Sequence, residues 1–561
     1  MRSGFACAFL ALLLFTSCTM EPTHTEPLKT EGLINELIEK HGIPGISIAV
    51  IEEGKVSYNA GHGLRSNDSE AQVDTETVFS AASLSKPVFA YIVMKLVETG
   101  DFDLDKPLYE YLPYQDLEHD ERYKQITGRM VLSHSSGLPN WRRGQLKIEF
   151  EPGDRYQYSG EGFVYLMRVI EHLQGKQINE IAQELVFEPL GMSRSSYVWE
   201  DRFESNFAPP HDFTGLTIPK RKRRSGNVAY SLQTTAADYA RLMLAIMKAE
   251  GLTQQTIKAM LTEQIGITDW ESLGWSLGWG VQQTAKGKAI WQWGDNGTYK
   301  AFTISYPGDK KGLVFLTNSE TGMRMIPTLI KHVFDDECPA FDMIDYPLED
   351  RPDQALLKSI LENGYDQAIS GYLQRGTDHH DTTLINANRM GRIGNRLMRE
   401  GRFDDAQKAY FSNVKAYASY NSYLRYADFC LRSGNHEEAK TYYQKASELR
   451  PENERLTTIL TQLNPESIEA NVVFKLRQLN HLYARHITVA GDFNGWNTIT
   501  HPFVKKNGEW VCRLKLAPGR YQYKFVIDGV WTLDPENTLA ELDDNENINS
   551  ILVVDEDTSG Q

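Results

Sequence analysis

A serine and a lysine three positions apart open a predicted helix in residues 79–86 (FSAASLSK). Positions i and i+3 share one face of a helix, so the hydroxyl of Ser83 can approach the ammonium of Lys86. A serine hydroxyl becomes a strong nucleophile only when a neighbouring base accepts its proton. The unpaired N–H groups of a first helical turn also suit a developing oxyanion. The pair predicts acyl transfer through Ser83; the alternative is an ordinary serine at the N-cap of a helix.

Three further blocks accompany this pair: residues 132–139 (LSHSSGLP), 156–160 (YQYSG) and 291–297 (WQWGDNG). Together, and in this order, the blocks resemble the serine β-lactamase and penicillin-binding-protein superfamily. The resemblance is greatest to the class C-like serine hydrolases, which include esterases and D-amino-acid peptidases. It covers residues 31–335, and an ordered set of motifs is far more specific than any one of them. It implies an α/β hydrolase domain in which helices flank an antiparallel sheet.

The resemblance implies a role for each matched residue. Ser83 would be the acylated nucleophile, and Lys86 would accept its proton or stabilise a neighbouring anion. Tyr158 matches the family's tyrosine, and a nearby ammonium would favour its phenolate form, which makes it a second candidate base. The backbone N–H groups of Ser83 and Asp295 would form the oxyanion hole. The alternative for Tyr158 is a core aromatic side chain. This chemistry requires no cofactor and no metal.

Two positions depart from the family pattern. The second motif usually ends in asparagine, where this chain has Gly160. The third offers lysine or histidine, where this chain has Gln292 followed by Trp293 and Gly294. In penicillin-recognising members those side chains help to bind the substrate amide and carboxylate, and a neutral amide cannot supply the cation that a carboxylate prefers. Both departures weaken a β-lactamase assignment more than acyl transfer itself. Gln292, Gly294 and Asp295 are the predicted oxyanion and substrate residues.

Three other features invite a chemical interpretation that their surroundings do not support. Residues 274–278 match the G-x-S-x-G elbow of α/β-hydrolases, which needs a strand before it and a helix after it. Residues 279–283 have strand character instead, so Ser276 is predicted to be structural. His134 suggests a catalytic triad, but in the resembled family this histidine belongs to a structural turn. The basic run at 220–224 is predicted to be a solvated loop rather than an anion-binding surface.

Length and composition indicate a multidomain globular protein. The 561 residues suffice for three or four domains that each bury a core. The hydrophobic content of 41% and the charged content of 24% are those of ordinary globular chains. The formal net charge of −16 argues against nucleic acid as a general partner. Cys338, Cys430 and Cys512 lie far apart, with neither disulfide nor metal spacing, so structural thiols are expected.

Residues 1–18 have the character of a targeting segment. Arg2 precedes an apolar run at residues 5–15, which is too short to span a bilayer and is followed by small residues before Cys18. The pattern resembles a bacterial lipoprotein signal whose Cys18 becomes the lipidated N-terminus; the alternative is plain secretion. Residues 19–30 are polar and contain proline, as in a tether. We therefore expect a membrane-anchored protein of the bacterial cell envelope, either periplasmic or at the cell surface.

Residues 353–464 carry a helical pattern with an internal repeat. The run GRFDDA at 401–406 recurs as GNHEEA at 434–439, and Tyr410 recurs as Tyr443 at the same offset. The units resemble tetratricopeptide repeats, which stack to bury their shared faces. This all-α segment is a candidate surface for a protein partner; the alternative is a plain helical linker.

Residues 470–556 change to alternating strands with glycine-containing turns, which predicts a small all-β, immunoglobulin-like sandwich. The runs 490–496 (AGDFNGW) and 518–531 (PGRYQYKFVIDGVW) resemble the family 48 carbohydrate-binding modules. That family includes the glycogen-binding domain of the AMP-activated protein kinase β subunit. The resemblance implies an α-glucan ligand; the alternative is a module that serves only as a structural domain.

Four side chains are the predicted sugar contacts of this module. The indole faces of Trp496 and Trp531 would stack on the C–H faces of glucose rings. Lys524 and Asn549 match positions that donate hydrogen bonds to sugar hydroxyls. The alternative places both tryptophans in the core, a role that better suits Trp510 at the start of an alternating strand.

These patterns lead to one main hypothesis and two alternatives. The main hypothesis is a lipid-anchored serine hydrolase that cleaves an ester or amide through an acyl-enzyme on Ser83. Its substrate would be a small molecule or a glycan-linked ester or amide, brought close by an α-glucan bound to the C-terminal module. The first alternative is a β-lactamase or D-Ala-D-Ala carboxypeptidase. The second is a glycan- or protein-binding lipoprotein without catalytic activity.

Overall fold

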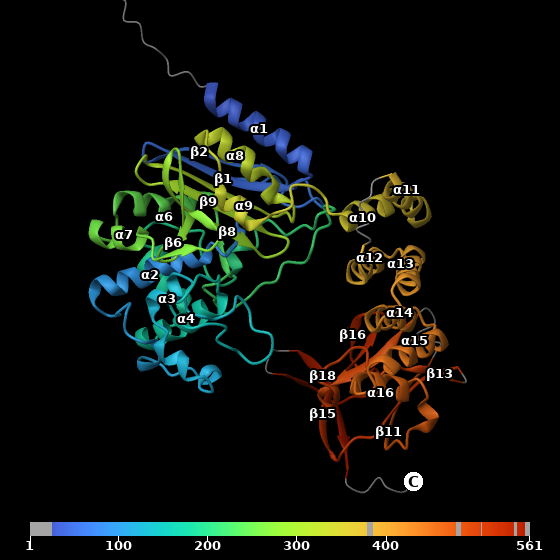
Figure 1. The fold of residues 1–561 in the computed structure, drawn as a ribbon. Helices are drawn as coiled ribbons and strands as arrows, with labels where there is room; N and C mark the ends of the chain where they lie inside the picture. The colour runs from blue at the N-terminus through green and yellow to red at the C-terminus, as the bar shows by residue number, and fades with distance from the viewer. Residues whose placement is uncertain (1–24, 379–384, 478–483, 507, 544–546, 556–561) are drawn as a thin grey trace, which may run out of the picture. The chain divides into compact units, whose positions relative to one another are not determined.

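The computed structural model describes residues 25–378, 385–477, 484–506, 508–543 and 547–555. The chain forms two compact units, Met1–Glu349 and Asp350–Gln561, which are described one at a time (Figure 1). The predicted signal segment at 1–18, with Cys18, lies outside the described residues. The predicted tether at 19–30 is described only from Thr25 onward, and that part is helical.

An antiparallel sheet forms the centre of the first unit. Its strand order, β2-β1-β10-β9-β8-β7-β6-β5, pairs the N-terminal hairpin with the last strand of the unit. Almost every residue of β1, β9 and β10 is buried, because both faces of these strands are covered. The strands are β1 Gly45–Glu52, β2 Lys55–Gly63, β5 Ile265–Ile267, β6 Trp270–Trp275, β7 Gly280–Thr284, β8 Gly287–Asp295, β9 Lys300–Tyr306 and β10 Lys311–Thr317.

Helices cover both faces of this sheet (Figure 1). Helices α1, α8 and α9 share one core cluster with the strands, to which Ile34, Ile330 and Phe341 contribute. Helices α2 to α7 pack into a larger cluster, together with the two-stranded ribbon of β3 and β4. The predicted fold class of the hydrolase domain is thus confirmed. The bounds are α1 Thr25–His41, β3 Phe79–Ala82, α2 Ser85–Thr99, α3 Gly128–Leu132, α4 Gly160–Gln174, α5 Ile178–Ala182, β4 Leu232–Thr234, α6 Ala236–Lys248, α7 Gln254–Leu261, α8 Ile326–Phe334 and α9 Pro339–Ile344.

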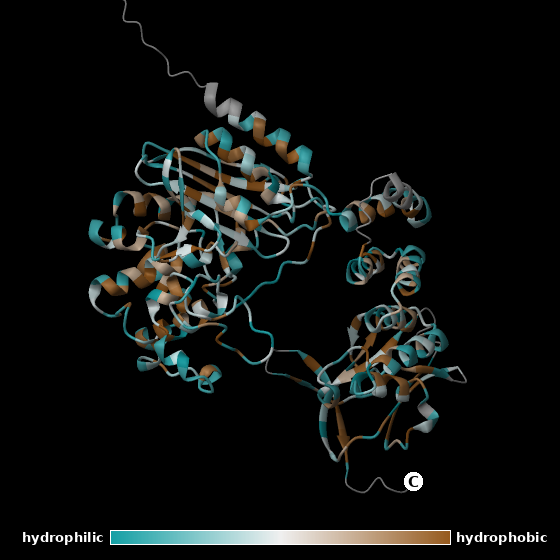
Figure 2. Cartoon of the chain, viewed as in Figure 1, coloured by the Kyte–Doolittle hydropathy of each residue, from teal (hydrophilic) through white to brown (hydrophobic). Residues whose placement is uncertain are grey.

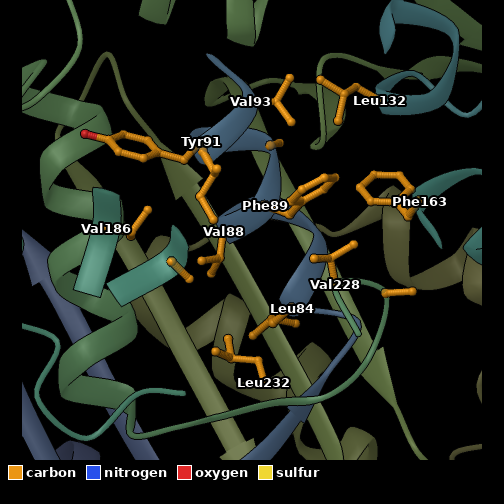
Figure 3. Close-up of a cluster of buried hydrophobic side chains, with 14 of the residues drawn as sticks. Leu84, Val88, Phe89, Tyr91, Val93, Leu132, Phe163, Val186, Val228 and Leu232 are labelled. Atoms are coloured by element: carbon orange, nitrogen blue, oxygen red, sulfur yellow. The ribbon is translucent and has the colours of Figure 1, made fainter. Parts of the chain in front are cut away.

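Helix α2 supports the turn that carries Ser83. It is buried along most of its length, and Figure 3 shows Val88 and Phe89 among side chains from other elements, including Leu132 and Phe163. Burying one such side chain stabilises the fold by roughly 1.5–3 kcal/mol. A helix packed on all sides cannot shift easily, so the loop before its first residue is held in one position.

Helices α10 to α16 open the second unit, and two consecutive pairs carry the repeat. A glycine with positive φ stands between the helices of each pair, 71° at Gly401 and 78° at Gly434, so the recurring motifs mark equivalent turns. Tyr410 and Tyr443 each donate a hydrogen bond to the first helix of their own pair, at 2.5 and 2.6 Å. The helices are α10 Pro352–Asn363, α11 Tyr365–Asp378, α12 Ala387–Arg399, α13 Phe403–Ala416, α14 Tyr420–Arg432, α15 His436–Leu449 and α16 Glu454–Gln462.

Two antiparallel sheets complete the second unit. One has the order β11-β14-β13, and the other has the order β12-β15-β18-β17 with β16 paired to β15. Phe474 packs against Tyr523 and Phe525, and Trp510 is only 1% exposed, so the predicted all-β segment has its expected core tryptophan. The strands are β11 Val472–Arg477, β12 Ile487–Gly491, β13 Val504–Lys506, β14 Glu509–Leu514, β15 Gly519–Ile527, β16 Val530–Thr532, β17 Ala540–Leu542 and β18 Ile548–Val554.

Apolar residues gather on the central strands and on the inward faces of the helices (Figure 2). Cys338, Cys430 and Cys512 are free and buried, in agreement with structural thiols. Among the described residues, no helix combines the length and the apolar character needed to cross a bilayer.

Candidate functional site

Ser83 occupies a sharp turn between β3 and α2. The strand ends at Ala82, whose φ of +48° lies in a region that residues with side chains rarely adopt. Ser85 stabilises this turn, because its hydroxyl donates to the carbonyl of Ala82 at 2.6 Å and accepts from the N–H of Leu232 at 2.9 Å. Ser83 is partly exposed, although Ala82 and Leu84 on either side are buried. A strained turn that presents one hydroxyl is typical of a functional position.

The amine of Lys86 lies beside this hydroxyl. Its Nζ is 3.1 Å from Ser83 Oγ and 2.8 Å from the carbonyl oxygen of Ala229. Lys86 is fully buried, and no carboxylate among the described residues forms an ion pair with it. Desolvation therefore lowers the pKa of Lys86 from 10.5 to about 7. A large fraction of this amine is neutral near pH 7 and can accept a proton.

Tyr158 completes the cluster, but its protonation differs from the expected phenolate. Its ring lies 4.7 Å from Lys86 Nζ, and its hydroxyl accepts a hydrogen bond from Gln292 Nε2 at 3.1 Å. Hydrogen bonds to Ser83 and Gln292 lower the pKa of Tyr158, but burial outweighs them and raises it far above its usual value. The ammonium expected to favour a phenolate is itself partly deprotonated, and Gln292 is neutral. The structure therefore favours Lys86 as the base and Tyr158 as a neutral hydroxyl.

His134 packs against Tyr158, and within the described residues its Nε2 has no hydrogen-bond partner. Its φ is +56°, its Nδ1 accepts the N–H of Ser159 at 3.0 Å, and its ring packs against the ring of Tyr158 at 4.3 Å between centroids. Burial lowers the pKa of this imidazole well below its usual range, with a smaller contribution from Lys86. This arrangement agrees with the predicted structural turn.

Ser276 is likewise structural. It is fully buried, its hydroxyl donates to the carbonyl oxygen of Trp279 at 3.1 Å, and the following element is strand β7 rather than a helix. The G-x-S-x-G match therefore lacks the strand–helix context of a nucleophile elbow.

The predicted substrate motif lies at the end of β8. Gln292 also donates to the carbonyl oxygen of Ser83 at 3.1 Å, so it braces the nucleophile turn. Only glycine fits at position 294, because a Cβ at Gly294 would overlap the carbonyl oxygen of Ala81 in β3. The carboxylate of Asp295 pairs with Lys300 at 2.5 Å. The close approach of β8 to β3 thus brings the backbone of residues 294–295 to the turn that carries Ser83. The oxyanion role of the N–H groups of Ser83 and Asp295 stays a prediction.

An aromatic side chain fills the space above Gly160, where the family usually has asparagine. A Cβ at Gly160 would lie 2.7 Å from the carbonyl oxygen of Asn140 and 2.8 Å from the indole of Trp141. Trp141 is 45% exposed, and its ring meets that of Tyr230 edge-on at 5.5 Å. No motif points to either ring; the single signal in the sequence is that Trp141 closely follows the LSHSSGLP motif.

Two cavities of about 490 and 510 Å³ flank this point, and both are lined by Tyr230 and Asn296. The first also contains Lys220, which the sequence assigned to a solvated basic loop. Instead, its Nζ donates to Gln233 at 2.8 Å and lies 4.3 Å from the ring of Tyr299. Burial lowers the pKa of Lys220 to about 7. Other members of the run do face solvent, in ion pairs such as that of Lys222 with Glu204 at 2.7 Å.

No group of three or more histidine, cysteine, aspartate or glutamate side chains within the described ranges is arranged to hold a metal ion.

The predicted sugar contacts of the sandwich separate into two sets. Trp496 and Trp531 lie side by side, with centroids 6.1 Å apart, and Trp531 is 46% exposed. Lys524 alternates with the inward-facing Tyr523 on β15, so it points to the outer face. Asn549 is different, since it is 1% exposed and its amide nitrogen donates to Gln522 at 2.8 Å. Internal hydrogen bonding therefore removes Asn549 from the predicted contact surface.

A family model described as Beta-lactamase matches residues 30–333, which is more than half of the 561-residue chain. The chain belongs to the β-lactamase family, whose members are serine hydrolases, and the expected resemblance is confirmed. A tetratricopeptide-repeat model matches residues 420–453. The model of the glycogen recognition site of AMP-activated protein kinase matches residues 477–559. Both of these resemblances are confirmed as well.

Individual relatives are distant. Penicillin-binding protein 4* of Bacillus subtilis (strain 168) is 23% identical over 393 residues, which cover 63% of this chain and 84% of that protein. Protein flp of Staphylococcus aureus is 20% identical over 342 residues, which cover 55% of this chain and 66% of that protein. A solved class C β-lactamase is 21% identical with a TM-score of 0.49, and covers 56% of this chain and 98% of its own.

Proposed function

We propose that the protein hydrolyses an ester or amide bond through a covalent acyl-enzyme on Ser83. One observation supports this most directly. The buried amine of Lys86, with its pKa lowered to about 7, lies 3.1 Å from the hydroxyl of Ser83, a partly exposed residue. A neutral amine at hydrogen-bond distance can act as the base for a serine nucleophile.

In the proposed reaction, the amine of Lys86 accepts the proton of Ser83 as Oγ attacks the carbonyl carbon of the substrate. The carbonyl oxygen becomes negatively charged, and the N–H groups of Ser83 and Asp295 would stabilise it. Collapse of this intermediate breaks the bond to the alcohol or amine, which takes a proton from the Lys86 ammonium through the hydroxyl of Tyr158. Water then attacks the acyl-enzyme, again with Lys86 as the base, and releases the acid and free Ser83.

The walls of the site favour an ester of an alcohol or sugar over a carboxylate-bearing β-lactam. Gln292 is neutral, and Trp141 fills the space above Gly160 that an asparagine would otherwise use. The rings of Trp141, Tyr230 and Trp293 offer partly exposed flat faces that suit the apolar side of a sugar ring. We therefore propose an acylated or esterified carbohydrate as the substrate class. A β-lactam or D-Ala-D-Ala peptide is the alternative.

The C-terminal module is proposed to hold an α-glucan on Trp496 and Trp531. Attachment to a polymer raises the local concentration of substrate without adding catalytic contacts. The helical repeats remain a candidate surface for a protein partner. The predicted signal segment is proposed to anchor the chain to the bacterial cell envelope through Cys18.

A labelling and activity screen tests the hydrolase proposal. The purified protein is treated with a fluorophosphonate, digested, and its peptides are weighed; we expect the adduct on the peptide that contains Ser83. In parallel, p-nitrophenyl esters, acetylated maltooligosaccharides, D-Ala-D-Ala peptides and a labelled penicillin are offered as substrates. Ester turnover without retained penicillin supports the proposal, and covalent penicillin at Ser83 supports the alternative. An unlabelled folded protein without turnover would identify a non-catalytic relative.

The indole pair of Trp496 and Trp531 gives a separate prediction. We expect Trp531→Ala to weaken retention in an amylose-containing native gel at least about tenfold, because the loss of a stacked indole from a binding surface costs on the order of 2 kcal/mol. Leu348→Ala is the matched control, since Leu348 is 49% exposed against 46% for Trp531 but lies in the other unit and outside the candidate active site. Equal retention of the wild type and Trp531→Ala would contradict this use of the module.

A further inference from the structure

The second unit contains a cavity of about 870 Å³ between the helical repeats and the sandwich. Helices α12, α13 and α14 form one wall, and the other comes from the end of β15, the turn into β16 and the residues before β12. Figure 1 shows β16 next to α14. This cavity belongs entirely to the second unit, whereas the candidate active site belongs to the first.

Positive charge dominates the lining of this cavity. Its arginines are Arg399, Arg425, Arg432 and Arg485. Within the described part of the chain, none of these four guanidinium groups forms an ion pair with a carboxylate. The carboxylates of the lining are already occupied. Asp428 pairs with Arg455 at 3.2 Å, and Asp528 accepts the backbone N–H groups of Arg485 and His486 at 3.1 and 2.9 Å. The cavity therefore has a surplus of unneutralised donors.

A buried histidine in the same lining lacks hydrogen-bond partners. The side chain of His486 is 7% exposed, and neither ring nitrogen has a partner among the described atoms. Burial, followed by the nearby His436 and Arg432, lowers the pKa of His486 to about 3, so its ring is neutral and still carries one N–H donor. An unsatisfied buried polar group destabilises the protein, and a bound acceptor would relieve that cost.

The cavity adjoins the indole pair that is predicted to stack on sugar. Trp531 contributes to the lining and is also the neighbour of Trp496, with ring centroids 6.1 Å apart. We propose that this cavity binds a phosphate ester carried by an α-glucan chain, whose adjoining glucose units lie on Trp531 and Trp496. The inference rests on the proposed binding of α-glucan by the module and adds a chemical preference to it.

Phosphate fits this lining better than the other anions of comparable size. A phosphate monoester carries about 1.5–2 negative charges and three strong acceptor oxygens, which can engage several guanidinium groups at once. A carboxylate satisfies one guanidinium fork, so it would leave most of these donors unpaired. An acidic peptide would use the arginines but has no need of the exposed indole pair. The shared position of Trp531 therefore favours a sugar phosphate.

Calorimetric titration of the full-length protein tests this with three probes: maltoheptaose, maltoheptaose phosphorylated on one 6-hydroxyl, and inorganic phosphate. We expect the phosphorylated sugar to bind at least about tenfold more tightly than the neutral one, and the advantage to shrink at about 0.5 M salt because screening weakens contacts between exposed charges. The double variant Arg425→Gln/Arg432→Gln should lose this advantage and keep the wild-type affinity for maltoheptaose. Arg392→Gln, an exposed arginine of α12 outside the lining, should behave like the wild type.

The outcomes separate this inference from the function on which it rests. Equal affinity for the two sugars, with maltoheptaose binding that depends on Trp531, would overturn the phosphate preference alone. The absence of any maltoheptaose binding would overturn the α-glucan function and this inference with it. Inorganic phosphate bound as tightly as the phosphorylated sugar would also overturn the inference, since the glucan would then contribute nothing. Tighter binding of a polyglutamate peptide than of the phosphorylated sugar would overturn it in favour of an acidic protein partner.

Discussion

Replacement of Ser83 by alanine is expected to lower ester hydrolysis by about 10⁴-fold or more, because the acyl-enzyme can no longer form. The loss should be chemical rather than structural. Ser83 is partly exposed, and the turn around it is held by Ser85, so removal of one hydroxyl leaves the core packing intact. The measurement is kcat/KM for a p-nitrophenyl ester, together with thermal unfolding to verify that the variant is folded.

Ser276→Ala is the matched control for this prediction. Its hydroxyl is buried and donates within the backbone turn to Trp279, so the substitution should leave fluorophosphonate labelling complete. Labelling that survives in Ser83→Ala but disappears in Ser276→Ala would show that the nucleophile is Ser276 of the elbow-like motif and not Ser83.

The second large effect is expected for Lys86→Met. Methionine keeps the length of the side chain but cannot accept a proton, so kcat/KM should fall by about 10³-fold or more. In the wild type, kcat/KM should rise with pH and level off above the Lys86 pKa of about 7, because the neutral amine is the active form. The residual activity of Lys86→Met should not show this rise of kcat/KM with pH. A pH–rate profile of both proteins checks the two statements together.

The same variant should be more stable than the wild type at low pH. In the unfolded chain Lys86 titrates near its ordinary value of 10.5, whereas in the folded protein it titrates at about 7. Between these values the unfolded state binds more protons, so stability rises as pH increases through this window. Below pH 7 the full cost of a buried ammonium opposes folding. We therefore expect Lys86→Met to raise the Tm of the first unit by several degrees at pH 6 and to lose this pH dependence.

Lys95→Met on the same helix is the control for both effects. Lys95 is only partly buried, so we expect its replacement to leave both the activity and the Tm at pH 6 near the wild-type values. If Lys86→Met retained most of the activity, the base would have to be sought at Tyr158, in line with the phenolate that the motif suggested.

Much of the hydrolase domain could be predicted because its motifs are local and ordered. The run around Ser83, the LSHSSGLP turn and the block around Gln292 each encode a short backbone geometry, and their order along the chain specifies the family. The glycine turns of the repeats are equally local, since Gly401 and Gly434 of the two recurring motifs both adopt a positive φ. The contact of Lys86 with Ser83 also follows from helical spacing alone.

Other features depend on groups far apart in the sequence. Trp141 fills the space above Gly160 because a loop folds back over the start of α4, and no local pattern encodes that approach. Lys220 belongs to a run with the composition of a solvated loop, yet its amine packs over the ring of Tyr299 and the side chain is only partly exposed. Asn549 matches a sugar-contact position by alignment of motifs, but its hydrogen bond to Gln522 of β15 is a cross-strand contact.

The sequence by itself determined which residues meet: a serine, a lysine and a tyrosine in one hydrolase site, two indoles on one sandwich, and paired helices before it. It did so because these relations depend on spacing and motif order. Only the tertiary structure decided the charge state of the site. Burial lowers the pKa of Lys86 to about 7 and raises the pKa of Tyr158, which keeps its hydroxyl neutral. The tertiary structure also decided where arginines and Trp531 enclose a common cavity. Burial sets both outcomes, since desolvation depends on every atom that surrounds a group and not on its neighbours along the chain.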